Sequence, residues 1–184
     1  MKHNVIHTSR SNLLVLRQMN KTPEFHPFET GRVFASSIPV LRVVSPVAVA
    51  PVDGDVALPA ALGAWAATQS LDAHKGRPVL AVSGDGGLGQ YLAEFTTAVK
   101  YGMNITHVLL NNNELGKISK EQRAGNWPVW QTALQNPDFV EFAIGCGGLG
   151  VRVSKPQQLE PALAEAISYP GPALVEILTD PELV

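Results

Sequence analysis

Asp85 and Asn112 carry side-chain oxygens at two positions where a metal ion could be bound. Asp85 lies in a Gly-Asp-Gly turn directly after the apolar run of residues 78–82, and Asn112 follows the apolar run of residues 105–110. Where a helix joins two parallel strands, a right-handed crossover places both strand ends on the same edge of the sheet. Carboxylate and amide oxygens suit Mg²⁺, which commonly keeps substrate phosphate groups among its ligands. The pattern therefore predicts that the two side chains share a magnesium site.

The glycines beside Asp85 predict a place for an anion next to that metal. Gly86 and Gly87 have no side chain, so a diphosphate could approach their backbone N–H groups closely. The helix expected to follow them has the positive end of its dipole here, which favours a bound anion. We interpret the two segments together as a site for Mg²⁺ and a diphosphate.

The elements that position these residues are predicted by a regular alternation of helix and strand patterns after residue 55. Such alternation is typical of an α/β fold with a doubly wound, mostly parallel sheet and helices on both faces. Asn136 is expected to be the N-cap of a helix, and His107, in mid-strand, is expected to be a satisfied core histidine rather than a ligand. The helices are expected at residues 57–70, 88–101, 115–123, 137–145 and 156–169, and the strands at residues 78–83, 105–111, 150–153 and 173–178.

Residues 1–55 differ from the rest of the chain. Their helix and strand signals are weak, with one short helix expected at residues 12–19 and one strand at residues 40–44. Prolines recur through the segment, and each removes a backbone hydrogen-bond donor. We therefore expect an atypical, poorly ordered amino-terminal segment at residues 1–55, followed by a single domain at residues 56–184.

Composition limits the classes of function. The net charge of −2 gives no electrostatic reason to expect a nucleic-acid partner. The longest apolar stretch, residues 38–52, contains Arg42 and three prolines and is too short and too broken to span a membrane. Cys146 is the single cysteine, which fits a reducing compartment, so we expect a cytoplasmic protein.

The sequence resembles the thiamine diphosphate-dependent enzymes, in particular the pyruvate oxidase and acetolactate synthase group. The cofactor domain of that family has a Gly-Asp-Gly motif that is followed, after a helix and a strand, by Asn-Asn. The resemblance covers roughly residues 56–184 and extends to segments outside these motifs. These segments are residues 57–65, 94–102, 112–116 and 171–176.

The resemblance implies thiamine diphosphate and Mg²⁺ as cofactors and a pyruvate-like 2-oxo acid as substrate. Asp85 and Asn112 would bind Mg²⁺ through side-chain oxygens and Glu114 through its backbone carbonyl, with two diphosphate oxygens and a water completing the shell. The residues expected at the cofactor are Gly84, Asp85, Gly86, Gly87, Asn112, Glu114, Leu115 and Gly116. With Asn112 at the spacing of the family, a plain turn aspartate at position 85 is the weaker interpretation.

The chain also departs from the family pattern. Family enzymes have an amino-terminal domain, whose glutamate activates the cofactor's aminopyrimidine, and a middle domain, and we expect neither in 184 residues. Alignment on Pro59 puts Gly54 where the family has a bulky apolar residue that supports the bent cofactor. We expect an altered amino-terminal part joined to a genuine cofactor domain. Such a fragment would not be catalytically competent alone, and would act as a homo-oligomer or with a partner chain that carries the pyrimidine-binding domain.

Two other interpretations stay open. Residues 84–89 match the G-x-G-x-x-G pattern of dinucleotide-binding domains, which would make the chain an NAD-binding Rossmann domain. That fold needs an acidic residue at the end of the second strand for the ribose, whereas residues 111–113 are asparagines. The chain could also be a non-catalytic remnant that serves as an interaction module.

Overall fold

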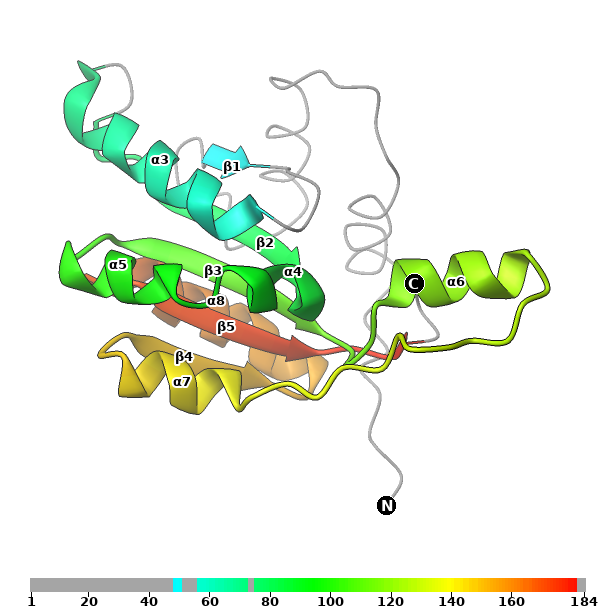
Figure 1. Cartoon of the computed structure of the whole chain (residues 1–184). Coiled ribbons are helices and arrows are strands. Elements are labelled where there is room, and N and C mark those ends of the chain that lie inside the picture. Colours follow the sequence, from blue (N-terminus) through cyan, green and yellow to red (C-terminus); the bar gives the residue numbers. More distant parts are fainter. Residues whose placement is uncertain (1–47, 51–55, 73–74, 182–184) are drawn as a thin grey trace.

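A five-stranded parallel sheet forms the centre of the computed structural model, which describes residues 48–50, 56–72 and 75–181 (Figure 1). The strand order is β1-β2-β3-β5-β4, and each neighbouring pair is parallel. This confirms the doubly wound α/β fold. The strands are β1 (Ala48–Ala50), β2 (Val79–Gly84), β3 (Ile105–Asn111), β4 (Leu149–Val153) and β5 (Ala173–Leu178).

β1 comes before residue 56, where we expect the domain to begin. It pairs in parallel with the start of β2, with Ala48 opposite Val79. The sheet thus includes three residues of the amino-terminal segment, and the domain boundary stays a prediction. The expected helix at residues 12–19, the strand at residues 40–44 and Gly54 lie outside the described residues.

One face of the sheet is covered by the helices α3, α4, α5 and α7 (Figure 1). α3 (Ala57–Ser70) has the expected bounds, with Pro59 in its first turn, where the missing N–H would have no helical partner in any case. Its buried residues pack with those of α5 (Glu94–Lys100) on β2 and β3. No helix in the described segments is long and apolar enough to cross a membrane.

The opposite face is covered by α8 (Leu159–Ser168), which is preceded by the short 3-10 helix η4 (Pro156–Gln158). Ala162, Leu163 and Ala166 of α8 pack on apolar residues of β2, β3, β4 and β5. Strands buried on both faces read as nearly continuous apolar runs, which explains the apolar composition. The helix predicted at residues 156–169 is thus observed as the 3-10 turn η4 followed by α8.

Three further predicted helices differ from the observed ones. In place of the helix predicted at residues 88–101 there are two helices, α4 (Asp85–Gln90) and α5. A turn separates them, in which the Tyr91 N–H donates to the Leu88 carbonyl at 3.0 Å. The helix expected at residues 115–123 is α6 (Gly116–Ala124). α7 (Phe139–Gly145) has Asp138 as its N-cap, which accepts from the Glu141 N–H. The prediction that Asn136 caps this helix is therefore wrong.

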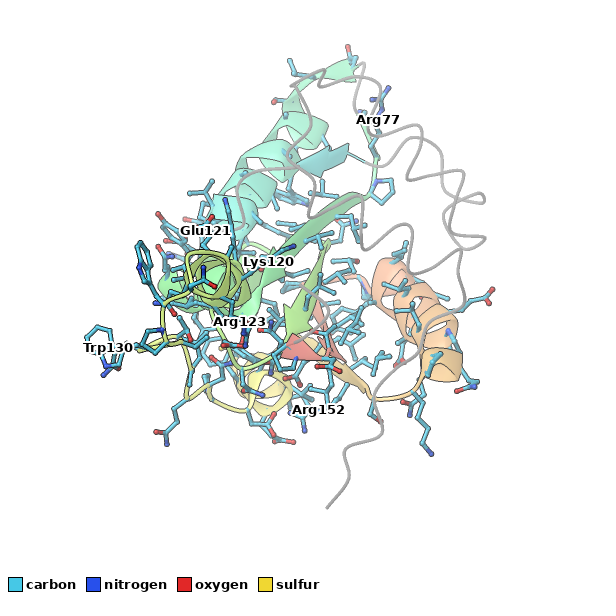
Figure 2. All side chains as sticks on the ribbon, turned by 90° about the vertical axis from the view of Figure 1, so that its right-hand side faces the viewer. Arg77, Lys120, Glu121, Arg123, Trp130 and Arg152 are labelled. Carbon is cyan, nitrogen blue, oxygen red and sulfur yellow. The ribbon has the colours of Figure 1, made fainter. Side chains whose placement is uncertain are left out.

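α6 and the following loop project from the carboxyl edge of the sheet (Figure 1). The loop turns back along α6, where Gln122 donates to the Trp130 carbonyl and accepts from the Trp130 N–H, at 3.2 and 3.0 Å. Trp127 and Trp130 are 68% and 70% exposed, and Trp130 extends outward from the ribbon (Figure 2). This loop thus presents large apolar side chains to solvent.

Gly150 allows β4 to approach α7 closely. A Cβ at Gly150 would lie 2.5 Å from the Val140 carbonyl oxygen and 3.1 Å from the Val140 Cα, both backbone atoms of the helix. Gly150→Ala should therefore lower the free energy of unfolding by about 1–3 kcal/mol, because the helix must move. Urea denaturation measures this change. Gly145→Ala is the control, since a Cβ there meets nothing within 4 Å, and equal stability of the two variants would contradict the close approach.

Candidate functional site

The candidate site lies at the carboxyl ends of β2 and β3. Gly84, the last residue of β2, pairs with Leu110 of β3, so the residues that follow the two strands are neighbours. Asp85 is the first residue of α4 and is only 2% exposed. The segments of Asp85 and Asn112 thus meet at the same edge of the sheet, as their spacing in the sequence predicts.

The carboxylate of Asp85 is buried and accepts hydrogen bonds from neutral donors. The side-chain amide of Asn136 donates to its Oδ2 at 2.7 Å. Burial raises the pKa of Asp85 above its usual value, and the hydrogen bonds from Asn136 and from the backbone N–H groups of Asp85, Gly86 and Asn113 oppose that rise. A buried carboxylate without a cationic partner among these donors is suited to bind a cation.

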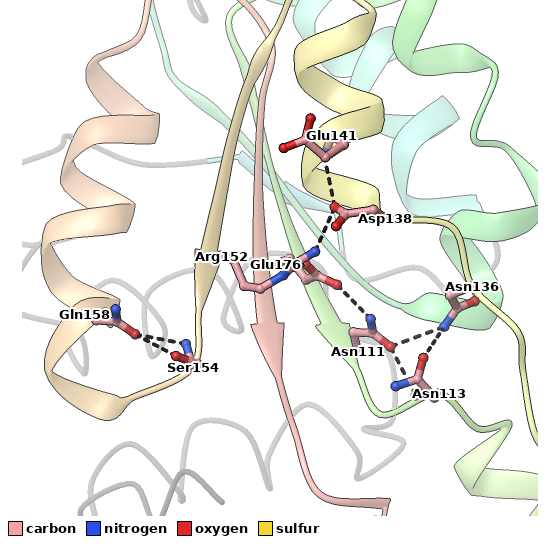
Figure 3. Close-up of polar contacts among 9 residues, drawn as sticks. All are labelled: Asn111, Asn113, Asn136, Asp138, Glu141, Arg152, Ser154, Gln158 and Glu176. Carbon is pink, nitrogen blue, oxygen red and sulfur yellow. Dashed lines mark hydrogen bonds and ion pairs between the residues drawn. The ribbon is translucent and has the colours of Figure 1, made fainter. Parts of the chain in front are cut away.

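Asn136 belongs to an amide cluster that the sequence did not identify. Its Nδ2 lies 3.2 Å from Oδ1 of Asn111 and 3.2 Å from Oδ1 of Asn113 (Figure 3). Asn111 is buried, and its own Nδ2 donates to Oε1 of Glu176 at 2.7 Å. Of the three consecutive asparagines at residues 111–113, Asn111 therefore faces the polar cluster, whereas the sequence analysis singled out Asn112.

Asn112 and Glu114 form a local turn. Oδ1 of Asn112 accepts from the Glu114 N–H at 3.1 Å, which leaves the oxygen a second lone pair. The Glu114 carboxylate accepts from Ser119 and Thr132. Among the described residues no backbone N–H donates to the Glu114 carbonyl. That carbonyl is therefore available to a ligand, whereas the two hydroxyl groups both donate to one oxygen of the carboxylate, Oε1.

Leu115 fills the space above Gly86. Its Cδ2 lies 2.6 Å from the position that a Cβ on Gly86 would occupy. The Leu115 N–H donates to the Thr132 carbonyl at 2.8 Å, which ties this segment to the returning loop. Gly87 and Gly116 are both buried. A Cβ on Gly86 would thus displace the end of the Leu115 side chain, so a glycine here favours close packing of the two predicted cofactor segments, a reason different from the approach of a diphosphate.

The donor set fits a hard cation that keeps external ligands. It consists of the Asp85 carboxylate, the Asn112 amide oxygen and the Glu114 carbonyl. Within the described residues, no group of three His, Cys, Asp or Glu side chains could hold a metal ion. Mg²⁺ commonly uses one or two carboxylates together with waters and phosphate oxygens. Such a site depends on an anionic ligand to complete its shell.

Arg152 holds two carboxylates beside the amide cluster. Its Nε donates to Glu176 Oε2 at 2.6 Å and its terminal nitrogen to Asp138 Oδ1 at 2.7 Å (Figure 3). Both hydrogen bonds, that to Asp138 first, raise the pKa of Arg152. The Glu141 N–H and Arg152 lower the pKa of Asp138. Glu176 is 2% exposed, so this cation compensates a carboxylate that water cannot reach.

His107 lies on β3, four residues before Asn111, and its side chain is on the same face of the sheet as that of Asn111. It is 1% exposed, and its Nε2 is 2.8 Å from Oγ of Ser83. Its Nδ1 has no hydrogen-bond partner within the described part of the chain. Burial lowers the pKa of His107 to about 4. This is the expected core histidine, neutral at physiological pH, but only its Nε2 is satisfied among the described residues.

Comparison with known proteins gives matches over the carboxy-terminal two thirds of the chain. Residues 55–177 match the family model of the thiamine pyrophosphate enzyme, C-terminal TPP binding domain. The protein YdaP of Bacillus subtilis is 41% identical over 102 residues, which are 55% of this chain and 18% of that protein. The mitochondrial acetolactate synthase catalytic subunit of Saccharomyces cerevisiae is 34% identical over 125 residues, 67% of this chain and 17% of that protein.

A solved structure gives a similar result. The thiamine diphosphate-dependent 4-hydroxybenzoylformate decarboxylase of Rhodococcus jostii RHA1 aligns with a TM-score of 0.61 and 26% sequence identity, over 67% of this chain and 23% of that one. The chain spans about a fifth of the length of the relatives it matches.

Proposed function

Because the chain belongs to the family of C-terminal TPP-binding domains of thiamine pyrophosphate enzymes, we propose that its candidate site binds Mg²⁺ and the diphosphate of thiamine diphosphate. Asp85, Asn112 and Glu114 are the proposed metal ligands. The observation that carries this proposal is the buried carboxylate of Asp85, which receives hydrogen bonds from neutral groups while its pKa is raised by burial.

The other predicted cofactor residues have supporting roles in this proposal. Gly84, Gly86 and Gly87 line the turn into α4, where backbone N–H groups can donate to a diphosphate. Leu115 and Gly116 lie at the start of α6, and packing of Leu115 on Gly86 keeps the two segments together. When bound, thiamine diphosphate supplies a thiazolium carbanion as the nucleophile for a 2-oxo acid.

We propose a pyruvate-like 2-oxo acid as the substrate of the whole assembly. Support comes from the acetolactate synthases among the relatives. The assembly would be a homo-oligomer, or would include a partner chain with the pyrimidine-binding domain. The exposed Trp127 and Trp130 support an assembly of this kind, because large apolar side chains on one loop favour a covered surface. The free Cys146 supports a cytoplasmic location.

The NAD-binding alternative has less support. A dinucleotide fold needs an acidic side chain at the end of the second strand, and β3 ends at Asn111. The nearby Glu114 carboxylate already accepts from Ser119 and Thr132. Both hydroxyl groups donate to Oε1, so a ribose would meet a carboxylate that is already partly engaged.

Mg²⁺ and thiamine diphosphate should bind together, each more weakly when the other is absent. The protein supplies only three metal ligands in this proposal, so the diphosphate must complete the shell. Titration calorimetry on the 184-residue chain, with Mg²⁺ and with chelator, measures the coupling, and NAD serves as the comparison ligand. Equal affinity for thiamine diphosphate in both conditions would contradict the site, and tighter binding of NAD would favour the alternative.

A further inference from the structure

Asn136 joins three segments of the chain at the carboxyl edge of the sheet. Its side-chain nitrogen lies within hydrogen-bond distance of Asp85 Oδ2, Asn111 Oδ1 and Asn113 Oδ1, at 2.7, 3.2 and 3.2 Å. Asp85 follows β2, Asn111 is the last residue of β3, Asn113 lies two residues beyond it, and Asn136 itself precedes α7. One amide therefore connects the proposed metal ligand to the next strand and to a distant loop.

The geometry of this amide restricts the Asp85 carboxylate. An NH₂ group has two hydrogens, so three acceptors cannot each receive one in full. The shortest contact is with Asp85, so one hydrogen points to Asp85 and the two asparagine oxygens share the other hydrogen. The bond to Oδ2 limits rotation of the carboxylate. Because the donor is neutral, it does so without pairing the negative charge that a cation would need.

Asn136 is itself held through a closed ring of interactions (Figure 3). Two residues further on, Asp138 caps α7 and pairs with Arg152. Arg152 also pairs with Glu176, which accepts from Asn111, and Asn111 in turn accepts from Asn136. The ring thus connects the loop before α7 to β4, β5 and β3, and fixes Asn136 from both its backbone and its side chain.

We propose that Asn136 is a positioning residue, which orients Asp85 for Mg²⁺ and is kept in place by this ring. The inference rests on the proposed function, since it takes Asp85 as a magnesium ligand. Mg²⁺ demands near-octahedral geometry at about 2.0–2.1 Å, whereas Ca²⁺ accepts longer bonds and irregular geometry. A carboxylate held in one orientation therefore favours Mg²⁺ over Ca²⁺.

The test compares two metals in Asn136→Ala. With saturating Mg²⁺, the variant should bind thiamine diphosphate about 10–100-fold more weakly than the unaltered protein, the usual effect of removing a partner of a metal ligand. With saturating Ca²⁺ the loss should be several-fold smaller. Asn136→Gln restores an amide donor with one more methylene and should recover part of the Mg²⁺-supported affinity.

Asn104→Ala is the matched control. The side chain of Asn104 likewise makes a hydrogen bond of 2.7 Å, here as the acceptor from the Trp65 indole, but it lies before β3, at the opposite end of the strand from the site. This variant should bind thiamine diphosphate as the unaltered protein does with both metals. If Asn136→Ala weakens binding equally with Mg²⁺ and with Ca²⁺, or leaves both unchanged, the positioning role is overturned.

Hydrogen exchange in the cofactor-free protein separates this inference from the proposed function. Asn136→Ala should speed exchange at the backbone N–H groups of Asn113 and Glu114 by about tenfold, the equivalent of one lost hydrogen bond, and leave Val175 in β5 protected. If the unaltered protein binds thiamine diphosphate with neither metal, the proposed function fails. The role of Asn136 toward Mg²⁺ then fails with it, whereas unchanged exchange in a protein that does bind the cofactor overturns the positioning role alone.

Discussion

Asp85→Ala is expected to lower the affinity for thiamine diphosphate and Mg²⁺ by at least about 10²-fold. Asp85 is the single ionised group among the three proposed metal ligands, and removal of even an outer partner of a ligand typically weakens a metal site 10–100-fold. Titration calorimetry with saturating Mg²⁺ measures the loss. Asp72→Ala is the control, since Asp72 is exposed and lies before β2, away from the carboxyl edge.

The same substitution should not destabilise the cofactor-free protein. The Asp85 carboxylate is 2% exposed and its burial disfavours the charged form. Its removal relieves that desolvation, while the Asn136 amide keeps two other acceptors. The melting temperature should therefore be unchanged or higher without ligands, and thiamine diphosphate with Mg²⁺ should no longer raise it. A variant that unfolds on its own would show instead that Asp85 is a structural residue.

The local features of the fold could be predicted from the sequence. The strands at residues 105–111 and 173–178 and the helix at residues 57–70 have the bounds that their apolar patterns predict. The edge of the sheet that carries Asp85 and Asn112 also follows from the sequence, because two parallel strands joined by a right-handed crossover must end together. These features depend on neighbouring residues and on general rules of chain topology.

The partners of Asp85 could not be predicted, because they come from distant parts of the chain. Asn136 lies 51 positions away, before α7, and sequence reasoning assigned it to a helix cap. The Asn-Pro-Asp order offers two capping residues, and Asp138 takes the cap because its carboxylate also pairs with Arg152 on β4. Only the strand order β3-β5-β4 brings these side chains together.

Buried polar groups concentrate on one face of the sheet. Asn111 and Glu176 on β3 and β5 are both nearly inaccessible to water, and each satisfies the other through one hydrogen bond. A buried polar group without a partner would cost about 1–3 kcal/mol. The polar cluster therefore requires the strands in this register, since a slip of either strand by one residue would turn its polar side chain to the apolar face that contacts α8. Folding and site geometry thus depend on the same residues.

His107 should make the protein less stable in acid. The pKa of His107 is about 4 in the folded protein, because it is buried, against 6.5 for an exposed histidine. Between pH 6.5 and pH 4 the unfolded chain therefore binds a proton that the folded protein does not. The contribution of His107 to the free energy of unfolding is complete above pH 6.5. It falls as the pH decreases to 4, by about 3 kcal/mol in total.

His107→Gln isolates this effect from the acidic residues. Glutamine can keep the hydrogen bond to Ser83, which His107 makes at 2.8 Å, but it does not titrate. Urea denaturation at pH 7 and pH 4 should show that the unaltered protein loses about 3 kcal/mol more than the variant over this range. Titration of Asp and Glu side chains contributes equally to both proteins, so the difference belongs to His107. Parallel losses in the two proteins would mean that His107 is protonated inside the folded sheet, and that Nδ1, which has no partner among the described residues, then finds one.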